Sequence, residues 1–149
     1  MIEHPLPAAL AAIRQDFLDL QEPDRLQLLL EFSHELPEMP ARLADHPDRQ
    51  ERVAECQSPV FIVVEVDDDH RVVMHATAPP EAPTTRGFAS ILAQGLTGLT
   101  AHEALAVPDD FPQSIGLTRA VSPLRIAGMT GMLGRAKRQV RERVAARER

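Results

Sequence analysis

The chain has 149 residues, a net charge of −6 and one cysteine; 44% of its residues are hydrophobic and 26% are charged. This length predicts a single domain over residues 1–149, large enough to fold without a disulfide or a structural metal. The amino terminus lacks a basic region followed by an apolar one, and no apolar run approaches the roughly 20 residues of a membrane span. Together with the lone cysteine, these features lead us to expect a cytoplasmic protein.

The charge is unevenly distributed along the chain. Residues 135–149 hold seven basic and two acidic side chains, so this segment carries +5 and the rest carries −11. A basic end can contact nucleic acid or membranes. However, the chain has no Trp or Tyr to stack on bases, so we expect neither partner. We interpret the segment as the soluble end of a terminal helix, where arginines complement the helix dipole.

Two helices are predicted at the amino-terminal end, the first over residues 7–20 and the second from Pro23 to about Leu36. The first helix has apolar residues at helical spacing: Leu10, Ile13, Phe17 and Leu20. In the second helix, four residues are expected to be mostly buried: Leu26, Leu29, Leu30 and Phe32. Pro37 then ends the second helix, and a loosely ordered stretch is expected to lead to Cys56.

Residues 60–66 and 71–77 are rich in Val and Ile and predict two strands. The turn residues 67–70 between them indicate an antiparallel hairpin. Three successive aspartates in this turn suggest calcium, but the Gly and the distal Glu of a calcium-binding loop are absent. We therefore interpret the segment as a solvated turn and expect no metal site there.

A rigid proline-rich connector, residues 78–83, precedes a helix that Thr84 or Thr85 is expected to cap. Its apolar residues are Phe88, Ile91, Leu92 and Leu96. Thr100 and Glu103 have the spacing of a capping box, which predicts a short helix to about Val107. A loop is expected around residues 108–112.

Ser122 and Pro123 are suited to the N-cap and first turn of a last helix. Its predicted buried face is formed by Met129, Met132, Leu133, Ala136, Val140 and Val144. Gly128 inside this helix costs about 1 kcal/mol relative to Ala. We therefore expect another segment to pack closely against it. Strands in the middle of the chain, with helices before and after, indicate an α+β fold.

Cys56 lies between a polar stretch and the apolar run of residues 60–64, so it is expected on a loop that leads into a strand. Its polar neighbours Glu55, Gln57 and Ser58 predict that the loop lies near the surface; the alternative is that Cys56 is a small buried apolar residue. A reactive thiol must form the thiolate, which the charge of Glu55 opposes. Four arginines are candidates to compensate: Arg52, Arg86, Arg119 and Arg125.

Other catalytic patterns are weak. The six histidines do not pair at metal-ligand spacing. His75 is the best-placed partner for a Cys–His hydrolase, although we expect it to face solvent from its strand. No phosphate-binding loop, dinucleotide fingerprint or nucleophile elbow occurs.

The ordered set of motifs resembles the SufE family, the sulfur acceptors of cysteine desulfurases, from about residue 8 to residue 144. The segments that carry the resemblance are Asp24-Arg25-Leu26-Gln27-Leu28-Leu29, Leu36-Pro37, Met39-Pro40, Arg52-Val53, Cys56-Gln57-Ser58, Arg86-Gly87, Leu117 and Ser122-Pro123-Leu124-Arg125. The resemblance implies a three-stranded antiparallel sheet packed against several helices, a fold shared with IscU-type scaffolds.

The resemblance also implies the chemistry. The active cysteine of the family falls on Cys56, and its conserved arginine falls on Arg125, which would support the thiolate or the loop. Cys56 would take persulfide sulfur from a desulfurase that depends on pyridoxal phosphate (PLP), stimulate that enzyme and pass sulfur to an iron–sulfur scaffold. No cofactor is expected on this chain, because the PLP belongs to the desulfurase.

The chain departs from the family pattern in several places. Glu55 replaces the usual Gly before the cysteine and is expected to restrict the movement of the loop. Pro80-Glu81 stands where a Ser-Asp pair is common, and Ala127 replaces an Asn. Two other functions remain open from the sequence: a non-catalytic adaptor of the desulfurase or scaffold, and a stand-alone thiol enzyme in which His or Arg activates Cys56.

Overall fold

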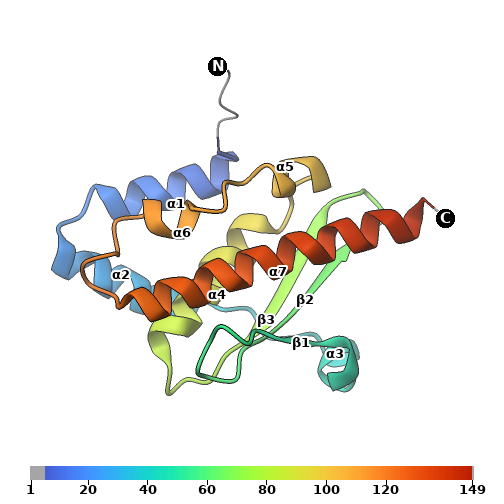
Figure 1. Ribbon diagram of the computed structural model, residues 1–149, viewed down its shortest axis with the longest axis horizontal. Helices are drawn as coiled ribbons and strands as arrows, with labels where there is room; N and C mark the ends of the chain where they lie inside the picture. The colour runs from blue at the N-terminus through green and yellow to red at the C-terminus, as the bar shows by residue number, and fades with distance from the viewer. Residues whose placement is uncertain (1–5, 149) are drawn as a thin grey trace.

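The computed structural model describes residues 6–148, which form an α+β fold with a three-stranded antiparallel sheet (Figure 1). In chain order the elements are α1 (Ala8–Leu18), α2 (Glu22–His34), α3 (Ala41–Ala44), the 3-10 turn η1 (Pro47–Arg49), β1 (Glu51–Arg52), β2 (Phe61–Val66), β3 (Val72–Thr77), α4 (Pro83–Leu96), α5 (Ala101–Leu105), α6 (Phe111–Ser114) and α7 (Pro123–Arg147). The predicted fold class is therefore confirmed.

The sheet has the order β1-β2-β3, and the hairpin of β2 and β3 pairs in register from Phe61 opposite Thr77 to Val66 opposite Val72. Its turn is closed by Asp67, whose carboxylate accepts hydrogen bonds from two backbone amides at 2.9 Å each. The hairpin therefore forms as predicted. Its turn is closed locally, as the residue types suggested.

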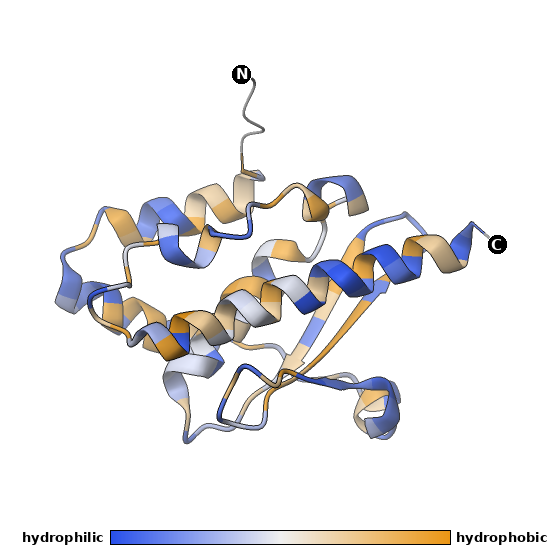
Figure 2. Cartoon of the chain, viewed as in Figure 1, coloured by the Kyte–Doolittle hydropathy of each residue, from blue (hydrophilic) through white to orange (hydrophobic). Residues whose placement is uncertain are grey.

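Helix α4 is the most buried of the helices among the described residues, with ten of its fourteen residues in the interior. It packs against α2, β3, α7 and α1, and the four apolar residues predicted for its core face are all buried. Figure 2 shows this contrast in hydropathy: the hairpin strands are largely apolar, whereas the carboxyl-terminal half of α7 is largely polar.

The carboxyl-terminal half of α7 covers an open strand edge with side chains. Strand β1 pairs only with the first two residues of β2. Beyond that point the backbone amide of Val64 donates to Gln139 Oε1 at 2.8 Å, Arg143 Nε donates to the Val64 carbonyl at 3.0 Å, and Arg147 donates to the Val66 carbonyl at 3.0 Å. The basic segment is the end of the terminal helix, as interpreted, but that interpretation is incomplete, since several of its side chains also hold the sheet.

Some local predictions are confirmed and others are wrong. The capping box of Thr100 and Glu103 and the N-cap Ser122 are both present. Helix α4 is instead preceded by Ala82, which makes no side-chain cap, and it begins at Pro83 rather than after Thr84 or Thr85.

Two predictions for the amino-terminal half are also wrong. Leu26, expected to be buried, is 37% exposed. The stretch before Cys56 that was expected to be loosely ordered contains α3, η1 and β1.

Candidate functional site

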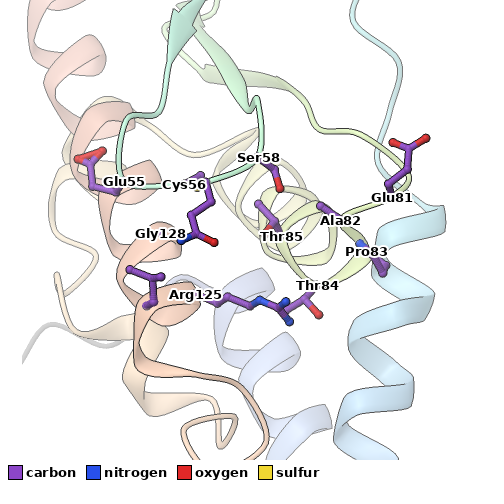
Figure 3. A pocket seen from close by; sticks show the side chains of 12 residues that line it. Glu55, Cys56, Ser58, Glu81, Ala82, Pro83, Thr84, Thr85, Arg125 and Gly128 are labelled. Carbon is purple, nitrogen blue, oxygen red and sulfur yellow. The ribbon is translucent and has the colours of Figure 1, made fainter.

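A pocket of about 320 Å³ lies where three segments meet (Figure 3). Its walls are residues 55–58, residues 81–85 at the beginning of α4, and Leu124, Arg125 and Gly128 in the first turns of α7. In the figure, Arg125 and Thr84 lie across the pocket from the strand-connecting loop that carries Glu55 and Cys56. The fold thus brings together both residues predicted for the site, although 69 positions separate Cys56 from Arg125 in the sequence.

Cys56 faces inward from a loop at the surface, the cysteine loop (residues 53–60). Its neighbours Glu55 and Gln57 are exposed, but Cys56 is only 7% exposed. The loop is closed by its own backbone, since the Val53 amide donates to the Val60 carbonyl at 2.9 Å and the Cys56 amide to the Val53 carbonyl at 3.1 Å. The predicted surface position of the loop is confirmed, while the thiol on it is buried, which the sequence left open.

Two glycines of α7 allow the cysteine loop to lie directly on the helix. A Cβ atom at Gly128 would stand 3.0 Å from Cys56 Sγ, and one at Gly131 would stand 2.7 Å from the Glu55 carboxyl carbon. Real side chains avoid such approaches. The prediction that a segment packs against Gly128 is confirmed, and that segment carries the cysteine itself.

The surroundings of Cys56 disfavour its thiolate. Burial, and to a smaller extent the negative charge of Glu55, raise the pKa of Cys56 to about 11. The positive charge of Arg135 opposes this shift but does not cancel it. At neutral pH the thiol is therefore protonated in this conformation, and a protonated thiol is a poor nucleophile.

The arginine that compensates Glu55 is not among the four proposed from the sequence. Arg86 donates to the carbonyls of Ser33 and Ala78, and Arg119 is an exposed side chain 3.7 Å from Glu22. Of the four, Arg125 alone lines the pocket.

Arg135 of α7 instead holds Glu55. Its Nε donates to Glu55 Oε1 at 2.7 Å and a terminal nitrogen donates to Oε2 at 3.2 Å. The other terminal nitrogen donates to Glu51 of β1 at 2.7 Å. The hydrogen bonds from Arg135, against burial, keep the pKa of Glu55 below its ordinary value.

Glu51 is the centre of a larger cluster. Besides Arg135, it accepts hydrogen bonds from Arg138 and, at 2.8 Å, from Gln139. Burial alone would raise the pKa of Glu51, but these three donors outweigh it and lower the pKa. One signal in the sequence could have pointed to the helix side of the cluster: residues 131, 135, 138 and 139 fall on one face of the predicted last helix.

The far wall of the pocket is suited to negative charge. The Arg125 guanidinium has no hydrogen bond or ion pair with the part of the chain that the structure describes. Beside it, the first turn of α4 lacks a side-chain cap, and Thr84 of that turn is only 9% exposed. A helix amino terminus carries partial positive charge, so Arg125 and this turn favour an anion opposite Cys56, whereas the exposed Glu81, which also lines the pocket, opposes it.

No histidine of residues 6–148 lines the pocket beside Cys56. His75 lies on β3, makes a contact of 3.1 Å with Glu65, and is not part of the pocket. His75 lies on the less buried face of β3, as expected, but its side chain beside Glu65 is only 16% exposed. Over the same residues, no three His, Cys, Asp or Glu side chains gather in a way that could hold a metal ion.

These features define a class of protein: a small α+β thiol protein whose one cysteine lies on a loop over a surface pocket. Comparison with known proteins gives the family. The model of the SufE family, described as an Fe–S metabolism associated domain, matches residues 11–140. The chain belongs to the SufE family, which acts in iron–sulfur metabolism and sulfur transfer.

Individual relatives agree with this assignment. The chain is 53% identical over 137 residues to an uncharacterized SufE-like protein of Mycobacterium tuberculosis, covering 92% of this chain and 94% of the relative. It is 30% identical over 94 residues to the cysteine desulfuration protein SufE of Plasmodium falciparum, covering 62% and 38% of the two chains. The solution structure of a hypothetical protein from Thermus thermophilus is similar with a TM-score of 0.83 and 33% identity, covering 95% of this chain and 99% of that one.

No helix within residues 6–148 has both the length and the apolar character that crossing a membrane requires.

Proposed function

We propose that the protein is a sulfur acceptor and carrier. Cys56 takes sulfur from the persulfide of a PLP-dependent cysteine desulfurase, the protein stimulates that enzyme, and the sulfur passes on to iron–sulfur cluster assembly. The observation that carries the proposal is the position of Cys56: the single thiol of a SufE-family chain lies at a pocket whose opposite wall is Arg125.

The transfer needs no oxidant or reductant. The Cys56 thiolate attacks the outer sulfur of the donor persulfide, a new S–S bond forms on Cys56, and the S–S bond of the donor breaks. The donor cysteine leaves as a thiolate, and the Cys56 proton goes to solvent or a base of the donor. One thiol on this chain is sufficient, because the outer sulfur atom passes directly from the donor cysteine to Cys56.

The pocket and the burial of Cys56 suit a carrier. A persulfide on Cys56 is anionic more readily than a thiol, and Arg125 and the first turn of α4 favour its charge. Because Cys56 is only 7% exposed, the loop must move outward for the donor to reach it. The protonated resting thiol is thereby kept from unspecific reaction until a partner is bound.

Intact mass spectrometry tests the proposal. The protein is incubated with a cysteine desulfurase and cysteine, and the expected product carries the mass of one added sulfur atom, removable by a reducing thiol. Cys56→Ser is the control and should show no addition while it remains folded. A desulfurase that turns over in the mixture, with the carrier mass unchanged, would contradict the proposal.

One observation favours a second candidate, a non-catalytic adaptor of the desulfurase. The resting thiol is buried and protonated, which a protein acting only by contact would tolerate. The same variant separates the two functions: an adaptor stimulates the desulfurase equally with Cys56→Ser, whereas a carrier loses the stimulation that depends on sulfur transfer.

A further inference from the structure

We propose that Arg135, acting through Glu55, is a positioning residue for Cys56, and that the Glu55–Arg135 ion pair must open before Cys56 reaches another molecule. The role of this opening in sulfur transfer rests on the proposed function. The structural claim, that this ion pair holds the thiol inside, can be tested without any desulfurase.

The contacts of the two neighbouring residues are coupled by the chain itself. Cys56 lies over Gly128 and Glu55 lies over Gly131, which is one turn further along α7. Consecutive Cα atoms are about 3.8 Å apart, so a larger outward movement of Cys56 must lift Glu55 from its place. The loop cannot release the thiol while both carboxylate oxygens of Glu55 remain bound to Arg135.

Arg135 is fixed on the side away from the loop. Arg135, Arg138 and Gln139 all donate hydrogen bonds to Glu51. Gln139 also accepts a hydrogen bond from the backbone N–H of Val64 in the sheet. Side chains on a helix lean toward its amino terminus, so Arg135 reaches back over the turn that contains Gly131. The arginine is therefore the immobile half of the ion pair, and the exposed Glu55 is the half that can leave.

The ion pair also opposes reactivity while it is closed. It keeps the carboxylate of Glu55 beside a thiol that is already buried, and both burial and this charge disfavour the thiolate. When the pair opens, the loop exposes the thiol to water. The access of a donor to Cys56 and the formation of its thiolate then increase together. Sulfur transfer is thereby coupled to the release of the Glu55 side chain from Arg135.

The rate of Cys56 alkylation by iodoacetamide, measured on the reduced protein alone across a range of pH, tests this. Glu55→Gln and Arg135→Gln are each expected to react about fivefold faster than the wild type, as for the loss of a partly exposed ion pair. The double variant is expected to be no faster than the faster single variant, because both changes break one contact.

The two single variants separate positioning from simple charge effects. If Glu55 and Arg135 acted only through their charges, Glu55→Gln would accelerate alkylation and Arg135→Gln would slow it, since Arg135 favours the thiolate. Opposite signs, or unchanged rates in both variants, would overturn the proposal. Acceleration in both variants, with a lower apparent thiol pKa in each, supports it.

Controls keep the test decisive. Arg147→Gln removes a side chain from the same helix that binds the Val66 and Asp67 carbonyls, so its alkylation rate should equal that of the wild type. Circular dichroism melting checks that each variant is folded. If Arg135→Gln does not fold, Arg135→Lys takes its place. Lysine keeps the positive charge but not the paired hydrogen bonds, so its alkylation rate should lie between those of the wild type and Glu55→Gln. A rate below that of the wild type would overturn the proposal. Sulfur loading of Cys56 by a desulfurase is scored separately, so the failure of one idea leaves the other measurable.

Discussion

The two halves of α7 hold their neighbours in opposite ways. In the amino-terminal half, Gly128 and Gly131 offer backbone alone, and the cysteine loop lies against them. In the carboxyl-terminal half, long side chains such as Gln139 and Arg143 extend to the edge of β2 and bind its backbone. The first contact is shallow and is closed by one partly exposed ion pair, whereas the second satisfies buried backbone groups. If the proposed opening of the ion pair is right, a single helix holds one segment permanently and another reversibly.

Gln139→Leu should have the largest effect, because it breaks the permanent contact. The buried backbone N–H of Val64 donates a hydrogen bond to Gln139 Oε1 at 2.8 Å and would lose its partner. An unsatisfied buried donor costs about 1–3 kcal/mol. Urea denaturation followed by circular dichroism should show a lower midpoint with an unchanged slope. Arg141→Gln on the exposed face of α7 is the control; equal midpoints for the two variants would show that the edge contact is not permanent.

Alkaline pH should have the next largest effect, at the reversible contact. The folded pKa of Cys56 is raised to about 11, above its ordinary value of 9.0, so the protonated thiol contributes stability that is complete below pH 9. This contribution is lost as the pH rises from 9 through 11, and linkage predicts a loss of about 1–2 kcal/mol over that window. Cys56→Ser should lack that part of the decline. Parallel stability curves for the two proteins in this range would contradict the raised pKa.

Acid should weaken the reversible contact by a smaller amount. Because the folded pKa of Glu55 is lowered by Arg135, its stabilisation is present above the ordinary Glu value of 4.5 and is lost as the pH falls below that value. A partly exposed pair is worth about 0.2–1 kcal/mol. Alkylation cannot report at this pH, so hydrogen exchange of the Cys56 amide is the suitable measurement. Its protection should fall in the wild type and stay constant with pH in Glu55→Gln.

Comparably small effects should come from exchanging glycines along the amino-terminal half of α7. Gly134 faces open space, so Gly134→Ala should stabilise the protein by up to about 1 kcal/mol through helix propensity. At Gly131 the added methyl group meets Glu55 at 2.7 Å, so Gly131→Ala should gain less and should increase the alkylation rate of Cys56. Melting temperatures and alkylation rates of the pair provide the check. Equal gains and equal rates would mean that the loop does not rest closely on the helix.

Local signals in the sequence were sufficient for much of the fold. The hairpin, the capping box at Thr100 and the N-cap Ser122 depend on neighbouring residues, and all three are confirmed. Gly128 also revealed a close contact, because a glycine within a helix is unfavourable unless something needs its space. Strand β1 was missed because its two residues form a strand only through pairing with Phe61 and Ile62.

The site was predictable in part. The family motifs placed Cys56 and Arg125, and the structure brings both to one pocket. The burial of the thiol could not be read from its polar neighbours, because Glu55 and Cys56 point to different places on α7. Arg135 was missed since 80 residues separate it from Glu55, and arginines at a helix end are common for other reasons.

The covering of β2 by α7 has a counterpart on the other side of the sheet. There the segment after α4 binds β3: Val72 donates to the Leu99 carbonyl at 2.7 Å, and Met74 donates to the Thr97 hydroxyl at 3.1 Å. Exposed strand edges are where proteins aggregate by adding strands from other molecules. With the longer strands β2 and β3 covered along these stretches from within, this small sheet offers little template for such growth, and the proposed movement of the cysteine loop would leave these contacts in place.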